Sequence, residues 1–265
     1  MALVDVSFIT YALRRQVSFK ALLPTDYRFL PWTETRFQSA PARTLYLLHG
    51  YTGYNNDFLT GSPIFQLAMQ HNLAVIMPSG ENAFYLEDAD KGEDYSKFVG
   101  KELVDFTRSM FHLSDRREDT FIGGVSMGGY GALITALRYP DTFSRAITLS
   151  GAYVELEFAD QKRYIPDINS DERYQRKVFG DPETMRQRNV DPRFCIEELR
   201  RQGKDVPEIY FACGEQDFMI ELNRKLHRYL EDNRIVHTYR EGAGTHSWDY
   251  WNPQLTAALD WLERA

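Results

Sequence analysis

Apolar and polar residues alternate through the first 24 positions of the chain. The apolar positions fall two residues apart in two groups: Val4, Val6 and Phe8, then Val17, Phe19 and Ala21. A period of two is the pattern of a half-buried β-strand, so each group predicts one strand, and Pro24 ends the second. We expect the two strands to pair as an antiparallel hairpin.

Beyond residue 43, short apolar runs alternate with segments of helical spacing. The predicted strands are 45–49, 73–78, 120–125, 146–149, 209–213 and 236–239. The predicted helices are 63–71, 95–111, 128–139, 220–233 and 255–263. Strands that alternate with helices predict a mostly parallel sheet covered by helices on both faces. The expected fold class is therefore α/β, a doubly wound sheet in one domain spanning residues 1–265.

Residues 152–205 break this alternation. The segment is rich in charged residues, contains Pro166, Pro182 and Pro192, and has only scattered apolar positions. Aromatic residues such as Tyr164, Tyr174 and Phe179 indicate that it packs rather than forming a linker. We expect a cap-like insertion of short helices over the carboxyl ends of the strands.

Charge and composition narrow the range of partners. The 31 basic and 38 acidic residues give a net charge of −7, which offers no electrostatic reason to bind nucleic acid or an anionic membrane. No apolar run approaches the roughly 20 residues of a membrane span, and the N-terminus lacks the pattern of a signal peptide. Cys195 and Cys213 form no CxxC motif and are expected to be free thiols. These features favour a cytoplasmic protein, and a homo-oligomer is compatible with them.

The segment Gly124-Val125-Ser126-Met127-Gly128 matches the pattern G-x-S-x-G between a predicted strand and a predicted helix. This strand–turn–helix context is that of a nucleophile elbow, which presents a serine on a sharp bend. Glycines are needed two residues before and after the serine because a Cβ there would collide with the neighbouring elements. We therefore predict that Ser126 is a catalytic nucleophile, rather than part of an ordinary glycine-rich turn.

A serine nucleophile needs a base and a group that orients the base. Of six histidines, His246 is the one in a loop between the last predicted strand and the last predicted helix, so it is the expected base. Asp217 follows the strand 209–213 and is the expected acid, with Glu215 as the competing carboxylate. The order Ser126, Asp217, His246 is the order of α/β-hydrolase triads.

Two backbone amides are needed to stabilise the oxyanion of the tetrahedral intermediate. The amide of Met127 directly follows the nucleophile and opens the predicted helix. The amide of Tyr51 is the second candidate, in the loop His49-Gly50-Tyr51 after the strand 45–49. We expect His49 to shape this loop.

Several segments resemble one known family. The elbow 124–132, His49-Gly50-Tyr51-Thr52-Gly53, Cys213-Gly214-Glu215-Gln216-Asp217 and His246-Ser247-Trp248 are similar to the esterase D group of α/β-hydrolases. That group includes S-formylglutathione hydrolases, feruloyl and acetyl-xylan esterases and mycolyltransferases, and the segment 82–85 is most similar to bacterial tributyrin-type esterases. The resemblance implies an α/β-hydrolase fold, the triad Ser126–Asp217–His246 and an oxyanion hole at Tyr51 and Met127.

The sequence thus predicts a serine carboxylesterase for short acyl esters, acetyl or butyryl, of small-molecule, carbohydrate or aryl alcohols. An acyltransferase, an S-formylglutathione thioester hydrolase and a non-catalytic binding protein on the same scaffold remain alternatives. No cofactor or metal is implied, because no phosphate loop, dinucleotide fingerprint or metal-spaced His/Cys set is present. Trp248, Tyr85 and Tyr130 are the main candidates for lining the substrate pocket. Four further aromatic candidates are Tyr51, Phe84, Tyr250 and Trp251, and core packing is the expected role of at least half of the seven.

Overall fold

The computed structural model describes residues 1–25, 40–88, 91–163 and 171–264. The strands are β1 Ala2–Thr10, β2 Arg15–Leu23, β3 Thr44–Leu48, β4 Ala74–Pro78, β5 Glu87–Asp88, β6 Glu93–Asp94, β7 Thr120–Val125, β8 Arg145–Leu149, β9 Glu208–Gly214 and β10 His237–Gly242. The helices before β8 are α1 Asp57–Gly61, α2 Ile64–Gln70, α3 Tyr95–Lys97, the π-helical turn η1 Phe98–Glu102, α4 Leu103–Met110, the 3₁₀ turn η2 Arg117–Asp119 and α5 Met127–Arg138. The helices after β8 are α6 Val154–Gln161, α7 Glu172–Phe179, α8 Pro182–Met185, α9 Pro192–Arg201, α10 Ile220–Asp232 and α11 Trp248–Leu262.

Eight strands form one sheet in the order β1-β2-β4-β3-β7-β8-β9-β10. The hairpin of β1 and β2 is antiparallel, and β2 joins β4 in an antiparallel pair. All pairs from β4 to β10 are parallel. The predicted N-terminal hairpin and mostly parallel α/β sheet are therefore confirmed.

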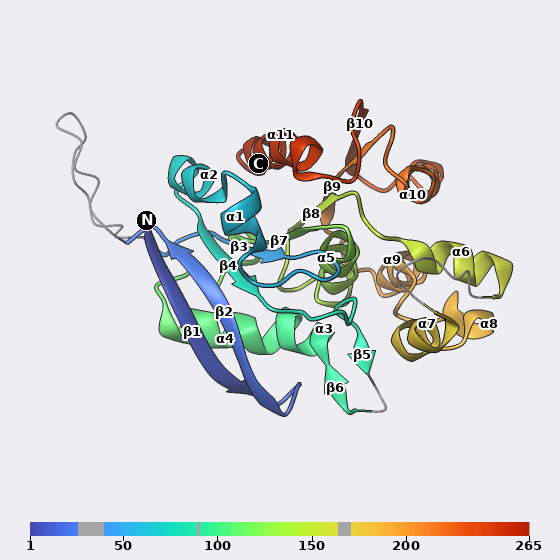
Figure 1. Ribbon diagram of the computed structural model, residues 1–265, viewed down its shortest axis with the longest axis horizontal. Coiled ribbons are helices and arrows are strands. Elements are labelled where there is room, and N and C mark those ends of the chain that lie inside the picture. Colours follow the sequence, from blue (N-terminus) through green and yellow to red (C-terminus); the bar gives the residue numbers. More distant parts are fainter. Residues whose placement is uncertain (26–39, 89–90, 164–170, 265) are drawn as a thin grey trace.

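The inner strands are buried on both faces, so each contributes alternate residues to two hydrophobic cores. Tyr46 and Leu48 of β3 belong to the core beneath α4, α5 and α10, whereas Leu45 and Leu47 belong to the core beneath α1, α2 and α11. Figure 1 shows these two helix layers on opposite sides of the sheet. This arrangement is why the strands read as continuous apolar runs rather than alternating ones.

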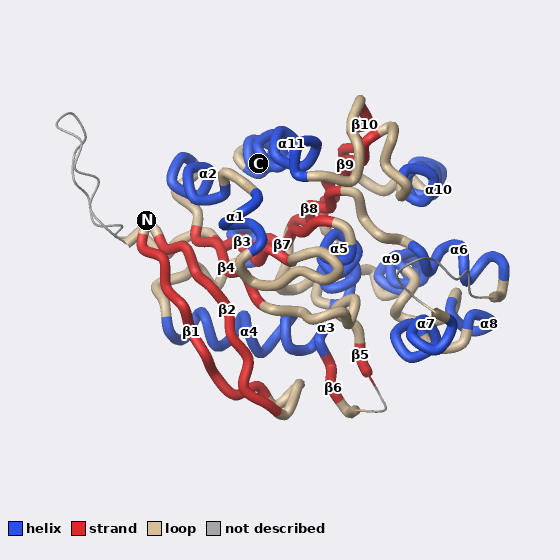
Figure 2. Tube along the Cα trace, in the orientation of Figure 1, coloured by secondary structure: helices blue, strands red, loops and turns tan. Residues whose placement is uncertain are grey.

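Some boundaries differ from the sequence prediction. The last helix begins at Trp248, seven residues before the predicted start at Leu255, and it contains Pro253. The short helix α1 and the two-residue strands β5 and β6 were not predicted, because such short elements carry no periodicity. Figure 2 shows β5 and β6 standing apart from the main sheet. Tyr164 and Pro166, both noted in the charged segment, lie outside the described residues.

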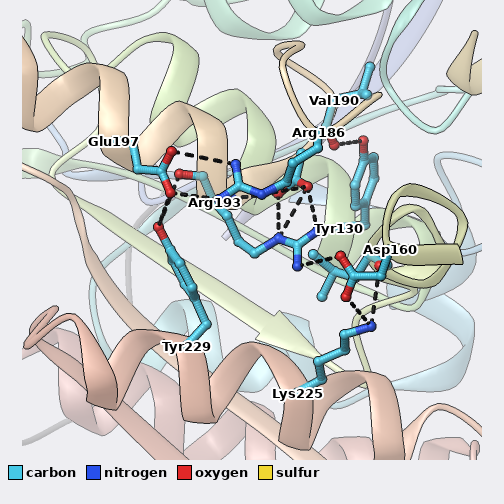
Figure 3. Close-up of polar contacts among 10 residues, drawn as sticks. Tyr130, Asp160, Arg186, Val190, Arg193, Glu197, Lys225 and Tyr229 are labelled. Carbon is cyan, nitrogen blue, oxygen red and sulfur yellow. Dashed lines mark hydrogen bonds and ion pairs between the residues drawn. The ribbon is translucent and has the colours of Figure 1, made fainter. Parts of the chain in front are cut away.

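Between β8 and β9, the described residues form the short helices α6 to α9. A charged cluster joins them to the sheet domain (Figure 3). Arg193 of α9 bonds through Nη2 to Oδ2 of the buried Asp191 at 2.7 Å and through Nη1 to Oδ1 of Asp160 in α6 at 2.9 Å. Asp160 also pairs with Nζ of Lys225 on α10 at 2.6 Å. The hydroxyl of Tyr130 in α5 donates to the Val190 carbonyl at 2.7 Å, which adds a neutral tie to the same region.

Candidate active site

Ser126 sits at the sharp bend between β7 and α5 with φ of 56° and ψ of −120°. A non-glycine residue with positive φ is strained, and such strain is typical of functional turns. Two glycines make the bend sterically feasible. A Cβ on Gly124 would lie 2.4 Å from the carbonyl of Gly128, and one on Gly128 would lie 2.1 Å from the Leu48 carbonyl oxygen. The G-x-S-x-G pattern therefore reflects real backbone contacts among β3, β7 and α5.

His246 lies in the loop between β10 and α11, within reach of the serine. Its Nε2 is 2.9 Å from the Ser126 Oγ. Aromatic rings contact the imidazole from two directions, with centroids 4.4 Å away for Phe218 and 5.0 Å away for Trp251. These contacts restrict the ring to the orientation in which Nε2 faces the serine.

Asp217 lies beyond β9, and only 2% of its surface is exposed. Its Oδ1 and Oδ2 are 3.0 and 2.9 Å from His246 Nδ1. Burial alone would raise the pKa of Asp217, but hydrogen bonds from His246, the Met219 amide and the Ser150 hydroxyl lower that pKa overall. An ionised carboxylate only accepts hydrogen bonds, so Nδ1 carries the imidazole proton and Nε2 accepts from the Ser126 hydroxyl.

The competing carboxylate Glu215 is not part of this chain of hydrogen bonds. Glu215 is exposed, as is Asp249, the other acidic residue close in sequence to the candidate triad. The Glu215 amide donates to the Gly242 carbonyl, which holds Glu215 beside β10. The carboxylate that bonds to His246 is that of Asp217. The structure thus brings together the three residues predicted for the triad.

The candidate oxyanion residues border the same cavity as Ser126 and His246. Met127 is the first residue of α5, and the first amides of a helix have no partner within it. Gly50 lies beside the elbow, since a Cβ there would be 3.5 Å from the Ser126 Cβ, an ordinary contact distance. Tyr51 therefore follows a residue that neighbours the nucleophile.

The cavity has a volume of about 230 Å³. Its lining is Tyr51, Thr52, Phe84, Ser126, Met127, Ala152, Val154, Phe158, Tyr174, Gln175, Phe179, Phe218, Met219 and His246. Apolar or aromatic residues of its wall come from the loop after β3, the loop before β5, the helices α6 and α7, and the residues that follow Asp217. Of the seven aromatic candidates, Tyr51 and Phe84 are in this wall.

The prediction that Tyr85, Tyr130 and Trp248 line the pocket is wrong for the described cavity. Tyr85 and Tyr130 are fully buried in the core, where their hydroxyls donate to the carbonyls of His49 and Val190. Trp248 packs against Gly61 of α1, where a Cβ would lie 2.4 Å from the indole. Each ring fills a space between secondary-structure elements, so none of the three faces the cavity.

Sequence reasoning missed Phe218, Phe158 and Gln175 as cavity residues. Phe218 directly follows the acid and is 69% exposed, so its position next to Asp217 was the one available signal. Phe158 and Gln175 lie in α6 and α7, in a segment whose pattern predicted packing without saying which side chains would meet the site.

Comparison with known proteins agrees with this geometry. Residues 10–262 match the protein family described as "Putative esterase". The chain belongs to this esterase family. It is 38% identical to an acetyl esterase of Caldicellulosiruptor saccharolyticus over 268 residues, covering all of this chain and 99% of the relative.

Two solved structures from Staphylococcus aureus resemble the esterase along its whole length. The fluorophosphonate-binding serine hydrolase F has a TM-score of 0.84 at 26% identity, covering 100% of this chain and 99% of the other. An S-formylglutathione hydrolase has a TM-score of 0.82 at 27% identity, covering 98% of each chain. The α/β-hydrolase fold and an enzyme of the serine-hydrolase class acting on ester bonds follow from these similarities.

None of the described helices is both long enough and apolar enough to cross a membrane.

Proposed function

We propose that this esterase hydrolyses short-chain carboxylic esters through an acyl-enzyme on Ser126, with His246 as general base and Asp217 as its orienting acid. The observation that carries the proposal is the unbroken series of hydrogen bonds from Asp217 through His246 to Ser126, which ends at the cavity. Ester bonds are the substrate class of the family to which the chain belongs.

In the first half-reaction the Ser126 Oγ attacks the ester carbonyl carbon while His246 Nε2 takes the serine proton. The carbonyl oxygen becomes an oxyanion, for which the amides of Tyr51 and Met127 are the proposed donors. When the intermediate collapses, the C–O bond to the alcohol breaks and His246 returns the proton to the leaving alkoxide. Water then repeats these steps on the acyl-enzyme, releasing the carboxylic acid and free Ser126.

The cavity has two unlike sides. The side toward α6 and α7, which we call the closed side, has Val154 and the buried Phe158 and Phe179 in its wall. On the other side the exposed Phe218 lies beside His246. Because His246 must reach the leaving oxygen, we assign the alcohol to the Phe218 side and the acyl group to the closed side.

This assignment favours small acyl groups and varied alcohols. A cavity of about 230 Å³ is below the range of about 300–1,000 Å³ for sites of drug-sized ligands. Each methylene that fits gains about 0.8 kcal/mol, whereas overpacking costs about 1–3 kcal/mol, so we expect kcat/KM to peak at roughly two to four acyl carbons. Carbohydrate and aryl alcohols fit the open side, since an exposed aromatic ring can stack on either.

Residues 152–205 are proposed as the cap that sets this acyl limit. The segment supplies α6 and α7, and these helices provide much of the apolar wall. A cytoplasmic location is proposed as well, supported by the two buried free thiols Cys195 and Cys213.

The test is a panel of p-nitrophenyl esters from acetate to palmitate, extended with acetylated xylan, a feruloyl ester and S-formylglutathione, assayed with the wild type and with Ser126→Ala. We expect the highest kcat/KM with acetate to butyrate and background turnover for Ser126→Ala, since triad residues act as a unit worth up to about 10⁶ in kcat. A maximum at eight carbons or more would refute the acyl assignment. Preference for S-formylglutathione, or acyl transfer to added alcohols in place of hydrolysis, would replace the proposed reaction with a thioesterase or an acyltransferase.

A further inference from the structure

The loop that carries the proposed oxyanion amide of Tyr51 has a strained backbone. Its next residue, Thr52, has φ of +62°, in the left-handed region that non-glycine residues rarely adopt. The turn is closed by one hydrogen bond of 3.1 Å from the Gly53 amide to the Gly50 carbonyl. A strained conformation persists only where surrounding groups hold it.

The segment 80–85 supplies those groups. The Thr52 amide donates to Oδ1 of Asn82 at 2.8 Å, which fixes the peptide between Tyr51 and Thr52. The Gly80 amide donates to Nε2 of His49 at 2.8 Å. Burial lowers the pKa of His49, in agreement with the neutral ring that this acceptor role requires. The loop is thus held on both sides of Tyr51.

Asn82 is also bonded to the helical segment. The hydroxyl of Tyr174, in α7, donates to the Asn82 carbonyl at 2.6 Å. The Tyr174 ring contacts the Tyr51 ring edge-on, with centroids 5.9 Å apart. One residue therefore contacts the oxyanion loop through its side chain and α7 through its main chain.

From these contacts we propose that Asn82 is a positioning residue for the oxyanion hole, and that Tyr174 ties α7 to the loop through it. The proposal rests on the proposed function, in which the Tyr51 amide stabilises the oxyanion. Loss of the Asn82 side chain removes the acceptor of the Thr52 amide, so the strained turn is free to relax. The peptides on both sides of Tyr51 then rotate together, and the Tyr51 amide turns away from the developing oxyanion.

Tyr174 also lines cavities, and the test must separate this contribution from its hydrogen bond to Asn82. It borders the active-site cavity and also a neighbouring cavity of about 190 Å³ that includes Asn82 in its lining. Its ring is thus a wall between the two spaces, whereas its hydroxyl makes the bond to Asn82. Tyr174→Phe keeps the ring and removes the hydroxyl.

The first experiment compares Asn82→Ala, Asn82→Asp and Asn56→Ala. Asn56 is the matched control because it lies in the next turn of the same region and its side chain makes no capping bond. We measure kcat and KM for an acetyl ester, and affinity for a trifluoromethyl ketone. In the ketone adduct the Ser126 Oγ bonds to the carbonyl carbon, His246 takes the serine proton and the carbonyl oxygen becomes an oxyanion.

For Asn82→Ala we expect kcat to fall about 10- to 100-fold with little change in KM, somewhat less than the 10²–10³ typical of deleting an oxyanion donor outright. Ketone affinity should fall by the same factor. Asn82→Asp keeps an acceptor for the Thr52 amide and should recover most of both losses, and Asn56→Ala should match the wild type. Unchanged kcat and ketone affinity in Asn82→Ala, or a drop in kcat without a drop in ketone affinity, overturns the proposal.

The second experiment is Tyr174→Phe. Loss of one hydrogen bond is expected to lower kcat and ketone affinity about 2- to 10-fold, with the same acyl-length optimum. A shifted acyl optimum with unchanged ketone affinity would show that the Tyr174 hydroxyl affects only the shape of the cavity. That result would contradict the proposed link from α7 through Asn82 to the oxyanion loop. Failure of the proposed function is distinguishable, since it would appear as wild-type activity in Ser126→Ala, whereas failure of this inference leaves Ser126→Ala inactive and Asn82→Ala active.

Discussion

The cavity lies between the ends of β7, β9 and β10 on one side and α6 and α7 of the helical segment α6–α9 on the other. The two sides are held in different ways. The sheet end is held by backbone contacts, since β7, β8, β9 and β10 are neighbouring parallel strands and the Ser126 amide bonds to the Leu149 carbonyl of the next strand at 2.8 Å. The helical segment is held by side chains instead: it adds apolar residues such as Leu156 and Ile196 to the core, and charged residues gather around Arg193 (Figure 3). The three candidate triad residues therefore stand at the ends of strands that backbone hydrogen bonds join into one sheet.

The sheet end and the helical segment also differ in how their buried carboxyl groups are paired. Asp217 at the sheet end has hydrogen-bond partners that lower its pKa. Glu155 in α6 is fully buried, and neither of its carboxyl oxygens has a hydrogen-bond partner in the described part of the chain. Burial, with a contribution from the nearby Asp191, raises the pKa of Glu155 well above its usual range. Of these two buried carboxyl groups, the one that bonds to His246 has hydrogen-bond partners, and the one in α6 has none in the described part of the chain.

The largest expected effect is at the sheet end, with Asp217→Asn. The amide favours the wrong tautomer of His246, so kcat should fall about 10⁴-fold while the fold is retained. Steady-state kinetics and circular dichroism measure the two quantities. Glu215→Gln is the control and should have wild-type kcat; a severe loss there with a mild one in Asp217→Asn would mean that the acid has been misassigned.

The next effect tests the support of the helical segment. Arg193→Met leaves Asp191 buried without its main partner, and removing one member of a buried ion pair typically costs about 3–5 kcal/mol. Urea unfolding followed by fluorescence measures the loss, and hydrogen exchange should locate it in α6–α9. The matched control is Arg201→Met on the same helix, whose exposed pair with Glu198 should contribute nothing measurable. Equal effects of the two variants would argue against the cluster as the main support.

Phe179→Ala tests whether this wall limits acyl length. Phe179 is buried between Phe84 and Phe158, with ring centroids 4.8 and 5.8 Å away. Its removal should raise kcat/KM for an eight-carbon ester relative to acetate by about 10-fold, the equivalent of two more buried methylenes. Phe218→Ala, on the alcohol side, should leave this ratio unchanged. If both variants shift the ratio equally, the two sides of the cavity have been wrongly assigned.

The smallest effect is a pH-dependent change in stability from Glu155→Gln. The folded protein keeps a proton on Glu155 that the unfolded chain loses above the usual pKa of 4.5, so the unfolded state binds fewer protons and stability falls as pH rises. Glutamine has no such dependence. The variant should match the wild type near pH 4.5 and exceed its Tm by about 2 °C or more at pH 8, measured by calorimetry. A constant Tm difference across this range would show that Glu155 does not titrate on unfolding.

The local sequence pattern was sufficient to predict a feature wherever that feature depends on residues that are neighbours along the chain. Ser126 could be predicted because glycine is required two residues before and after it, where a Cβ would lie only 2.1 to 2.4 Å from a backbone atom. Asp217 and His246 could be predicted because each follows a strand of a parallel sheet, and such strand ends meet at one edge. The hairpin of β1 and β2 followed from a period of two.

The pocket could not be predicted in this way. In the sequence, two sets of aromatic residues look alike: Tyr85, Tyr130 and Trp248, and Phe84, Phe179 and Phe218. In the structure, the first set fills the core or packs on α1, whereas the second lines the cavity. Which way an aromatic ring points depends on the space left by elements distant in sequence. The contact of Asn82 with both Thr52 and Tyr174 likewise joins three separated segments.

The sequence by itself determined the α/β sheet, the elbow and the order of the candidate triad residues, since these depend on periodicity and on glycines with local steric causes. Only the tertiary structure decided the size of the cavity, the burial of Glu155 and the contacts that hold the loop after β3. Those properties arise where α6, α7 and the loop 80–85 meet across the cavity, and side-chain packing between distant segments leaves no periodic signal along the chain.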